Sequence, residues 1–279
     1  MKNTIRLLLI ITLITVAFIC SCNDTSNDAQ ITPATIDILK IGKADCIVIN
    51  TGSKIVMIDT GEADNISDIV DYMEYNNYNK IDTLILTHYD KDHIGGAYEV
   101  ISRYDVSSVI ESIKQDDTVN YINYHNAMSK KGITPLKLSE NYRFTYDSCQ
   151  FEIDIPKQTK YAENNDNNLS LIISMKCGEK SFLFCGDAME ARLSEFISQN
   201  QASYDFMKFP YHGNYIENYV ELLNSVSPKY VAITDSKKNT ASAIVLATLY
   251  DRYLDVYETR YGEINVYTDG KSIQLSQKN

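Results

Sequence analysis

The sequence lacks any apolar run long enough to cross a membrane. Its N-terminal apolar stretch, Leu7–Cys20, has 14 residues, whereas a transmembrane helix needs about 20. Lys2 and Arg6 precede this stretch and supply the short basic region of a secretory signal. The pattern therefore predicts a signal peptide rather than an anchor helix.

The apolar stretch ends in Ile19-Cys20-Ser21-Cys22 and turns polar at once. A small residue before a cysteine at this position resembles a bacterial lipobox. We expect residues 1–21 to be a lipoprotein signal peptide, Cys22 to be the lipidated first residue of the mature chain, and residues 22–33 to be a linker. The mature protein would then be exported and lipid-anchored on the outer face of a bacterial membrane. The alternative is an ordinary signal peptide with incidental cysteines.

Basic residues are also scarce. Loss of Lys2 and Arg6 with the signal peptide changes the formal charge from −11 to −13. Binding to nucleic acid without sequence preference needs clustered lysine and arginine, so no extended nucleic-acid-binding patch is expected. A small or single-ended anionic substrate stays compatible with this charge, because bound metal ions supply positive charge of their own.

The cysteines show no C-x-x-C spacing, which argues against a cysteine-rich zinc site. Four cysteines follow Cys22, namely Cys46, Cys149, Cys177 and Cys185. Cys46 and Cys185 lie in apolar strand patterns and are expected to be buried thiols. A disulfide can form in an oxidising compartment, but the sequence does not determine which cysteines pair.

Beyond the linker, strand and helix patterns alternate over about 250 residues, enough for one large α/β domain. The expected strands are Thr35–Ile41, Cys46–Ile49, Ile55–Asp59, Ile81–Leu86, Val106–Ile110, Leu169–Met175, Ser181–Cys185, Phe206–Pro210, Tyr230–Thr234, Leu254–Glu258 and Glu263–Tyr267. The expected helices are Ile66–Tyr75, Val119–Met128, Ala188–Ser198, Thr240–Tyr250 and one that starts at His93. Residues 104–157 carry the weakest pattern.

The most informative segment follows the apolar run Ile81–Leu86. His88, Asp90, Asp92 and His93 fall within six residues of one another. Imidazole and carboxylate ligands on a loop suit one or two divalent metals, zinc above all. Such a site is a common means of activating water for hydrolysis. Asp92 could instead cap the helix that starts at His93, but capping does not account for the other three side chains.

Two later strand ends also carry candidate groups. One strand ends in Gly186-Asp187, where a carboxylate follows a close backbone approach. Another ends in Tyr211-His212-Gly213. The remaining histidine, His125, lies in a helix pattern and is expected to be a surface or half-buried residue.

These segments together resemble a known family. His88-x-Asp90-x-Asp92-His93 is similar to the HxHxDH motif of the metallo-β-lactamase superfamily, with aspartate in place of the second histidine. That variant, followed by Ile94-Gly95-Gly96, resembles the ComEC-type branch, named for the extracytoplasmic domain of a bacterial DNA-uptake channel. Further segments agree in order and spacing: Gly42–Ile47, Ile58–Gly61, Asn167–Leu171, Phe184–Asp187, Lys208–Gly213 and Tyr261–Gly270. The resemblance implies an α/β fold, a four-layer αββα sandwich over residues 34–279.

The resemblance also implies a dinuclear metal site. His88 and Asp90 would hold one ion, and Asp92, His93 and His212 a second, with Asp187 between the two. A further ligand is expected before the strand at Leu171, where Asp166 is the best candidate and Asn167 or Asn168 the weaker ones. For Lys91 two alternatives remain: contact with an anionic substrate, or an ordinary solvated loop lysine.

Two catalytic residues follow from the same resemblance. Asp92 would orient the attacking hydroxide as well as bind metal. Tyr211 stands where the branch typically has a histidine, and it would either donate to a developing oxyanion or pack against the pocket.

The function expected from this reading is metal-dependent hydrolysis outside the cytoplasm. Two divalent ions, zinc or alternatively manganese, would hold a bridging hydroxide that attacks a phosphodiester or phosphoester. One alternative is a lactam, thioester or cell-envelope ester hydrolase that uses the same site. Another is a non-catalytic surface binding protein stabilised by metal.

Overall fold

A computed structural model describes residues 31–278 of the chain. The expected signal peptide, Cys22 and most of the linker lie outside these residues. Within residues 31–278, no helix is both long and apolar enough to span a bilayer.

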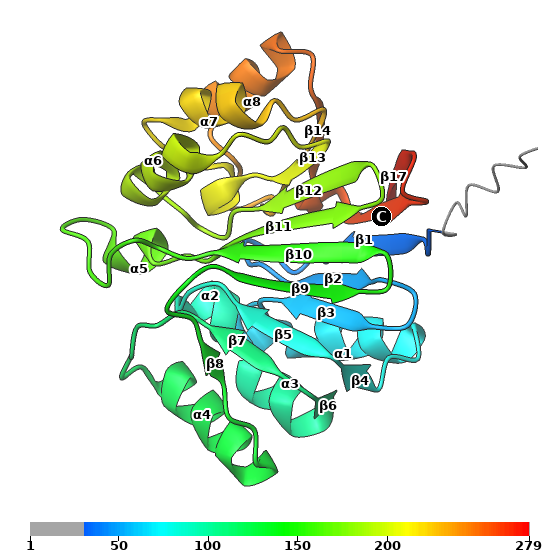
Figure 1. The fold of residues 1–279 in the computed structure, drawn as a ribbon, viewed down its shortest axis with the longest axis vertical. Coiled ribbons are helices and arrows are strands. Elements are labelled where there is room, and N and C mark those ends of the chain that lie inside the picture. Colours follow the sequence, from blue (N-terminus) through cyan, green and yellow to red (C-terminus); the bar gives the residue numbers. More distant parts are fainter. Residues whose placement is uncertain (1–30, 279) are drawn as a thin grey trace, which may run out of the picture. The chain divides into compact units, whose positions relative to one another are not determined.

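The first half of the domain and the C-terminal hairpin form an eight-stranded sheet (Figure 1). Its strands lie in the order β17 (Ile273–Lys278), β16 (Glu263–Thr268), β1 (Ala34–Ile38), β2 (Ile47–Asn50), β3 (Ile55–Ile58), β5 (Thr83–Leu86), β7 (Val109–Glu111) and β8 (Leu136–Lys137). The strands from β3 to β8 run parallel. A short parallel pair, β4 (Lys80–Ile81) and β6 (Asp105–Val106), forms a separate two-stranded sheet.

The second half forms a seven-stranded sheet. Its order is β15 (Asp255–Glu258), β14 (Tyr230–Ile233), β13 (Phe206–Lys208), β12 (Lys180–Phe184), β11 (Ile172–Cys177), β10 (Cys149–Asp154) and β9 (Tyr142–Tyr146). Here the strands from β12 to β15 run parallel.

Helices cover the outer face of each sheet, which gives four layers (Figure 1). One set consists of α1 (Ile66–Tyr75), α3 (Ala97–Arg103) and α4 (Val119–Lys131), and the other of α6 (Glu190–Gln199), α7 (Tyr219–Val226) and α8 (Ala243–Asp251). Short helices occupy loops: η1 (Ala63–Asn65), α2 (Lys91–Ile94), α5 (Asn165–Asn168), η2 (Pro210–Gly213) and η3 (Thr259–Tyr261). The expected αββα sandwich is confirmed.

Burial explains why the central strands were recognisable from their sequence. All residues of β3 and β5 are buried, as expected of parallel strands covered on both faces. One hydrophobic cluster fills the space between the two sheets, and two others lie between a sheet and its helices. On α1, Ile69 and Met73 face the core, four residues apart, as a helix requires.

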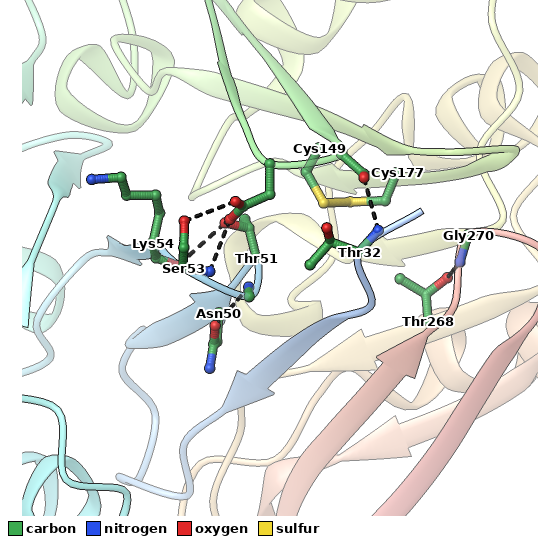
Figure 2. Close-up of a disulfide and its surroundings, with 12 residues drawn as sticks. Thr32, Asn50, Thr51, Ser53, Lys54, Cys149, Cys177, Thr268 and Gly270 are labelled. Carbon is green, nitrogen blue, oxygen red and sulfur yellow. Dashed lines mark hydrogen bonds between the residues drawn. A yellow bond between two sulfur atoms is a disulfide. The ribbon is translucent and has the colours of Figure 1, made fainter. Parts of the chain in front are cut away.

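A disulfide joins Cys149 to Cys177 (Figure 2). The two residues lie directly opposite each other at one end of the antiparallel pair β10–β11. Next to this bond, the backbone N–H of Thr32 donates to Ser148 Oγ over 2.8 Å. Cys46 and Cys185 are free and buried, as predicted.

Some element boundaries differ from the sequence prediction. The first strand ends at Ile38 rather than Ile41. The helix predicted to start at His93 starts at Lys91, and Asp90, not Asp92, holds its N-cap position without a side-chain cap bond. The capping role considered for Asp92 is therefore wrong. Strands β8, β9, β10 and β17 and helix α7 were not predicted.

Candidate metal centre

The site lies where the carboxyl ends of the parallel strands of both sheets meet. The loop after β5 carries His88 to His93, the loop after β12 carries Asp187, and η2 after β13 carries His212. The two sheets are joined at this edge, because the Leu171 N–H donates to the Thr87 carbonyl over 2.9 Å. Ligand sites in open α/β sheets typically form at this end of the strands.

Four of the predicted ligands form one cluster. Asp92, His93, Asp187 and His212 each offer a ligand atom, and these atoms all lie within 4.8 Å of one another. His93 Nε2 is 3.3 Å from Asp187 Oδ1, and His212 Nε2 is 3.2 Å from Asp187 Oδ2. His212 Nε2 also lies 3.4 Å from Asp92 Oδ2.

His88 and Asp90 lie beside this cluster. The ring centroids of His88 and His93 are 4.1 Å apart. His88 Nε2 is 3.7 Å from Asp90 Oδ2, and the Asp90 side chain is 40% exposed while His88 is buried. The two residues thus form a more open extension of the cluster, on the side that solvent reaches.

The cluster and the adjacent His88 contain buried polar atoms that no other described residue satisfies. His88 Nε2, His93 Nε2, His212 Nε2 and Asp187 Oδ1 are buried, and within residues 31–278 none of them has a hydrogen-bond partner. Unpaired buried polar atoms are rare and costly. Imidazole nitrogen and carboxylate oxygen are preferred ligands of zinc and related ions, so these residues fit a divalent metal centre.

Residues behind the cluster determine which ring nitrogen faces it. Asp59 Oδ2 lies 2.8 Å from His93 Nδ1, and Asp59 itself accepts from Thr87 N and Thr87 Oγ1 over 2.8 and 2.7 Å. His212 Nδ1 lies 2.9 Å from Thr234 Oγ1. A partner at Nδ1 orients the ring and leaves Nε2 for a metal.

Neighbouring carboxylates favour the charged, doubly protonated form of His93 and His212 when no metal is bound. Burial alone lowers the pKa of His93, but the carboxylates of Asp187 and Asp59 outweigh burial and hold that pKa well above its usual value. The pKa of His212 is raised against burial by Asp187 and Asp45. Burial raises the pKa of Asp187, but the two histidines reverse this and hold it well below the usual value.

A family model described as the metallo-beta-lactamase superfamily matches residues 40–233. The chain belongs to this superfamily. Two curated relatives are each 23% identical to the chain and match 73% of it: Recombination protein 2 of Haemophilus influenzae and ComE operon protein 3 of Bacillus subtilis. The chain spans only 24% and 28% of their respective lengths.

Solved structures agree on the metallo-beta-lactamase fold. YhfI from Bacillus subtilis, a metallo-beta-lactamase fold protein, gives a TM-score of 0.55 at 10% identity, over 88% of this chain and 100% of its own. CmlA from Streptomyces venezuelae, a diiron beta-hydroxylase, gives 0.52 at 11% identity, over 88% of this chain and 54% of its own. Because a diiron beta-hydroxylase shares this fold, the fold alone does not determine the reaction.

The other predicted site residues of this metallo-beta-lactamase-fold chain are less closely tied to the cluster. The Asp166 carboxylate forms an ion pair with Lys114 and accepts from Asn165 Nδ2, so its role as a ligand stays a prediction. Asn168 Oδ1 accepts from the backbone N–H of Arg192. Lys91 is 74% exposed and lies 3.3 Å from Glu62.

Tyr211 lies at the rim of the site in a strained backbone. Tyr211 and His212 have φ of 49° and 51°, a left-handed conformation that costs a residue with a side chain about 1–3 kcal/mol. Burial raises the pKa of Tyr211, and Asp187, Asp90 and Asp92 raise it further. Its phenol therefore keeps its proton near neutral pH and can act as a hydrogen-bond donor.

Four polar residues behind the ligands were not predicted from the sequence: Asp45, Asp59, Lys208 and Thr234. Each is completely or almost completely buried. A signal was present, because Lys208 interrupts the otherwise apolar segment Phe206–Phe209, and a charge in a buried strand needs a partner. His125 is half-buried as predicted, with its Nε2 3.3 Å from Glu111.

Proposed function

We propose that this chain is an exported metal-dependent hydrolase of phosphodiester or phosphoester bonds, of the ComEC-type branch. The observation that carries the proposal is the set of buried, unpaired ligand atoms on His88, His93, His212 and Asp187. Similarity to ComE operon protein 3 supports the branch.

Each predicted ligand has a defined part in this proposal. His88 and Asp90 would hold one divalent ion and Asp92, His93 and His212 the other. The two oxygens of Asp187 face different histidines, and Asp187 would serve both ions. When bound, zinc or manganese ions lower the pKa of water and neutralise negative charge on a substrate. Asp92 is ionised, because His212 and His93 hold its pKa well below the usual value despite burial.

Groups at the rim support an anionic substrate. Lys43 Nζ lies 5.4 Å from the centroid of the Tyr211 ring, which places a positive charge beside a phenol donor. Tyr211 would donate to the oxygen on which negative charge develops. Preorganised donors of this kind typically contribute 10²- to 10³-fold to turnover, about 3–4 kcal/mol.

The disulfide supports export. Disulfides such as Cys149–Cys177 persist in oxidising compartments and are rare in the cytosol. With the signal pattern of residues 1–21, this favours a mature protein outside the cytoplasm, lipid-anchored at Cys22 on the outer face of a bacterial membrane.

The test is a panel of chromogenic phosphodiester, phosphomonoester, lactam and thioester substrates, assayed with the zinc- or manganese-loaded full chain. We expect turnover of phosphodiesters or phosphomonoesters that His212→Ala abolishes, and a clear loss of turnover in Tyr211→Phe with unchanged metal content. Turnover of lactams or thioesters alone would overturn the substrate class. No turnover of any substrate by a fully loaded protein would favour a metal-stabilised binding protein.

A further inference from the structure

An enclosed ion pair lies behind the metal ligands. The side chains of Asp45 and Lys208 are 2% and 0% exposed, and Lys208 Nζ contacts Asp45 Oδ2 directly. Asp45 belongs to the loop between β1 and β2, whereas Lys208 ends β13, so the pair joins the two halves of the domain.

Lys208 also reaches the loop that carries Asp187. Its Nζ donates to the Gly186 carbonyl over 3.2 Å and lies 3.8 Å from Asp187 Oδ1. One ammonium group therefore contacts both the backbone just before a predicted ligand and the ligand itself.

Asp45 reaches a different ligand. Its Oδ1 accepts from Thr234 Oγ1 over 2.6 Å and lies 3.4 Å from His212 Nδ1. Thr234 Oγ1 is in turn 2.9 Å from the same ring nitrogen. The carboxylate and the hydroxyl thus hold the side of the His212 ring that faces away from the cluster.

Asp45 could itself be taken for a metal ligand, because it groups geometrically with Asp59 and His93. The Lys208 ammonium already occupies its Oδ2, and Thr234 occupies its Oδ1. The oxygen atoms of Asp45 are thus used within the protein. A buried ion pair contributes little net stability compared with apolar residues of the same volume, so stability alone is a weak reason for this one.

We propose that the Asp45–Lys208 pair positions the metal ligands: Lys208 holds the Gly186-Asp187 loop, and Asp45, through Thr234, holds the His212 ring. Neither residue contacts metal or substrate. The inference depends on metal binding at the cluster, as in the proposed function, but not on the reaction catalysed. Partners of this kind typically change metal affinity 10- to 100-fold.

The test variant is Asp45→Asn/Lys208→Met, which removes both charges and leaves neither one unpaired. The matched control is Lys54→Met/Asp82→Asn, which removes a Lys–Asp pair of 2.9 Å before β3 and β5, at the end of these strands remote from the site. Zinc affinity is measured by chelator competition, and ligand geometry by the visible absorption spectrum of the cobalt(II) form.

We expect zinc affinity to fall about 10- to 100-fold in the test variant, with an altered cobalt spectrum, and to stay at the wild-type value in the control. Thr234→Val, which keeps both charges, serves if the test variant does not fold, and should shift the same spectrum in the same direction. Wild-type zinc affinity and an unchanged cobalt spectrum in a folded variant would overturn the inference. Failure of the wild-type chain to bind zinc would instead overturn the metal centre itself.

Discussion

At the scale of single residues, the site contains buried imidazoles whose pKa is raised by carboxylates inside the cluster and behind it. Against the effect of burial, Asp187 and Asp59 raise the pKa of His93, and Asp187 and Asp45 raise the pKa of His212. A metal must displace the protons that these carboxylates favour. Metal binding and proton binding therefore compete at the same Nε2 atoms.

This competition predicts proton release on metal binding. The pKa of His93 and of His212 is raised in the metal-free protein. Both imidazoles are therefore expected to be in the doubly protonated, positively charged form just below neutral pH. Zinc binding at pH 6 should release about two protons per chain, and zinc affinity should rise with pH. Calorimetry in buffers of different ionisation enthalpy measures this number. A binding enthalpy independent of the buffer would contradict it.

Gly186 provides a second test at this scale. Its φ is +51°, and an added Cβ would lie 3.1 Å from the Thr87 side chain and 3.3 Å from Ser170 Oγ. Gly186→Ala should destabilise the protein by about 2–3 kcal/mol and weaken zinc binding, because the Asp187 loop must move. Denaturant unfolding and zinc titration give the two quantities.

Gly132→Ala is the matched control for this substitution. Gly132 has φ +70°, and no atom lies within 4 Å of an added Cβ. Alanine at this position therefore has the strain of a left-handed backbone but no steric clash. Gly132→Ala should lower the free energy of unfolding by about 1–2 kcal/mol and leave zinc affinity unchanged. Equal losses of stability and zinc affinity in both variants would show that packing at Gly186 does not position Asp187.

At the scale of elements, the sequence was most informative where burial is complete. Strands β3 and β5, in which every residue is buried, were predicted because their apolar runs are short and bounded. Apolar and polar residues alternate along β9 and β10; this is the pattern of a half-buried strand, and the sequence prediction overlooked it.

The predicted metal ligands and the residues that support them also differed in how far the sequence could predict them. His88 to His93 could be predicted because they form one local motif. Asp45 could not, because its partner Thr234 is 189 residues away, and only the folded chain brings them together. Asp166 was expected to be a ligand only from the family resemblance; the fold pairs it with Lys114, and its role as a ligand stays a prediction.

The disulfide gives a prediction at the scale of elements. It closes a loop across 28 residues and lies at the end of β10–β11 opposite the metal site. Cys149→Ala/Cys177→Ala should lower the free energy of unfolding by about 2–4 kcal/mol while zinc content stays unchanged. Denaturant unfolding with and without reductant measures this. Reductant should then have no effect on the variant, and wild-type stability in the variant would contradict the prediction.

At the scale of the whole molecule, the formal charge of the chain is −11. Under the proposed function, this acidic protein would bind small anionic substrates at a membrane surface. Metal ions, rather than a basic surface, would provide the positive charge that such substrates need. Long nucleic acids would be repelled by the remainder of the surface.

The anchor is tested by Cys22→Ala. A fatty-acid analogue should label the wild-type chain and leave the variant unlabelled, because the thiol of Cys22 is the expected attachment point. Cys20→Ala is the control and should be labelled like the wild type. Equal labelling of the Cys22→Ala and wild-type proteins would refute the anchor.

The metal centre itself is tested most directly by elemental analysis of the purified full chain after zinc loading and dialysis at neutral pH. The proposed site predicts about two divalent ions per chain, with the ion at His88 and Asp90 held more weakly, as expected for a dinuclear hydrolase. Asp187→Ala should reduce occupancy at both positions. A wild-type chain that retains no metal after zinc addition would contradict the metal centre and the hydrolase assignment together.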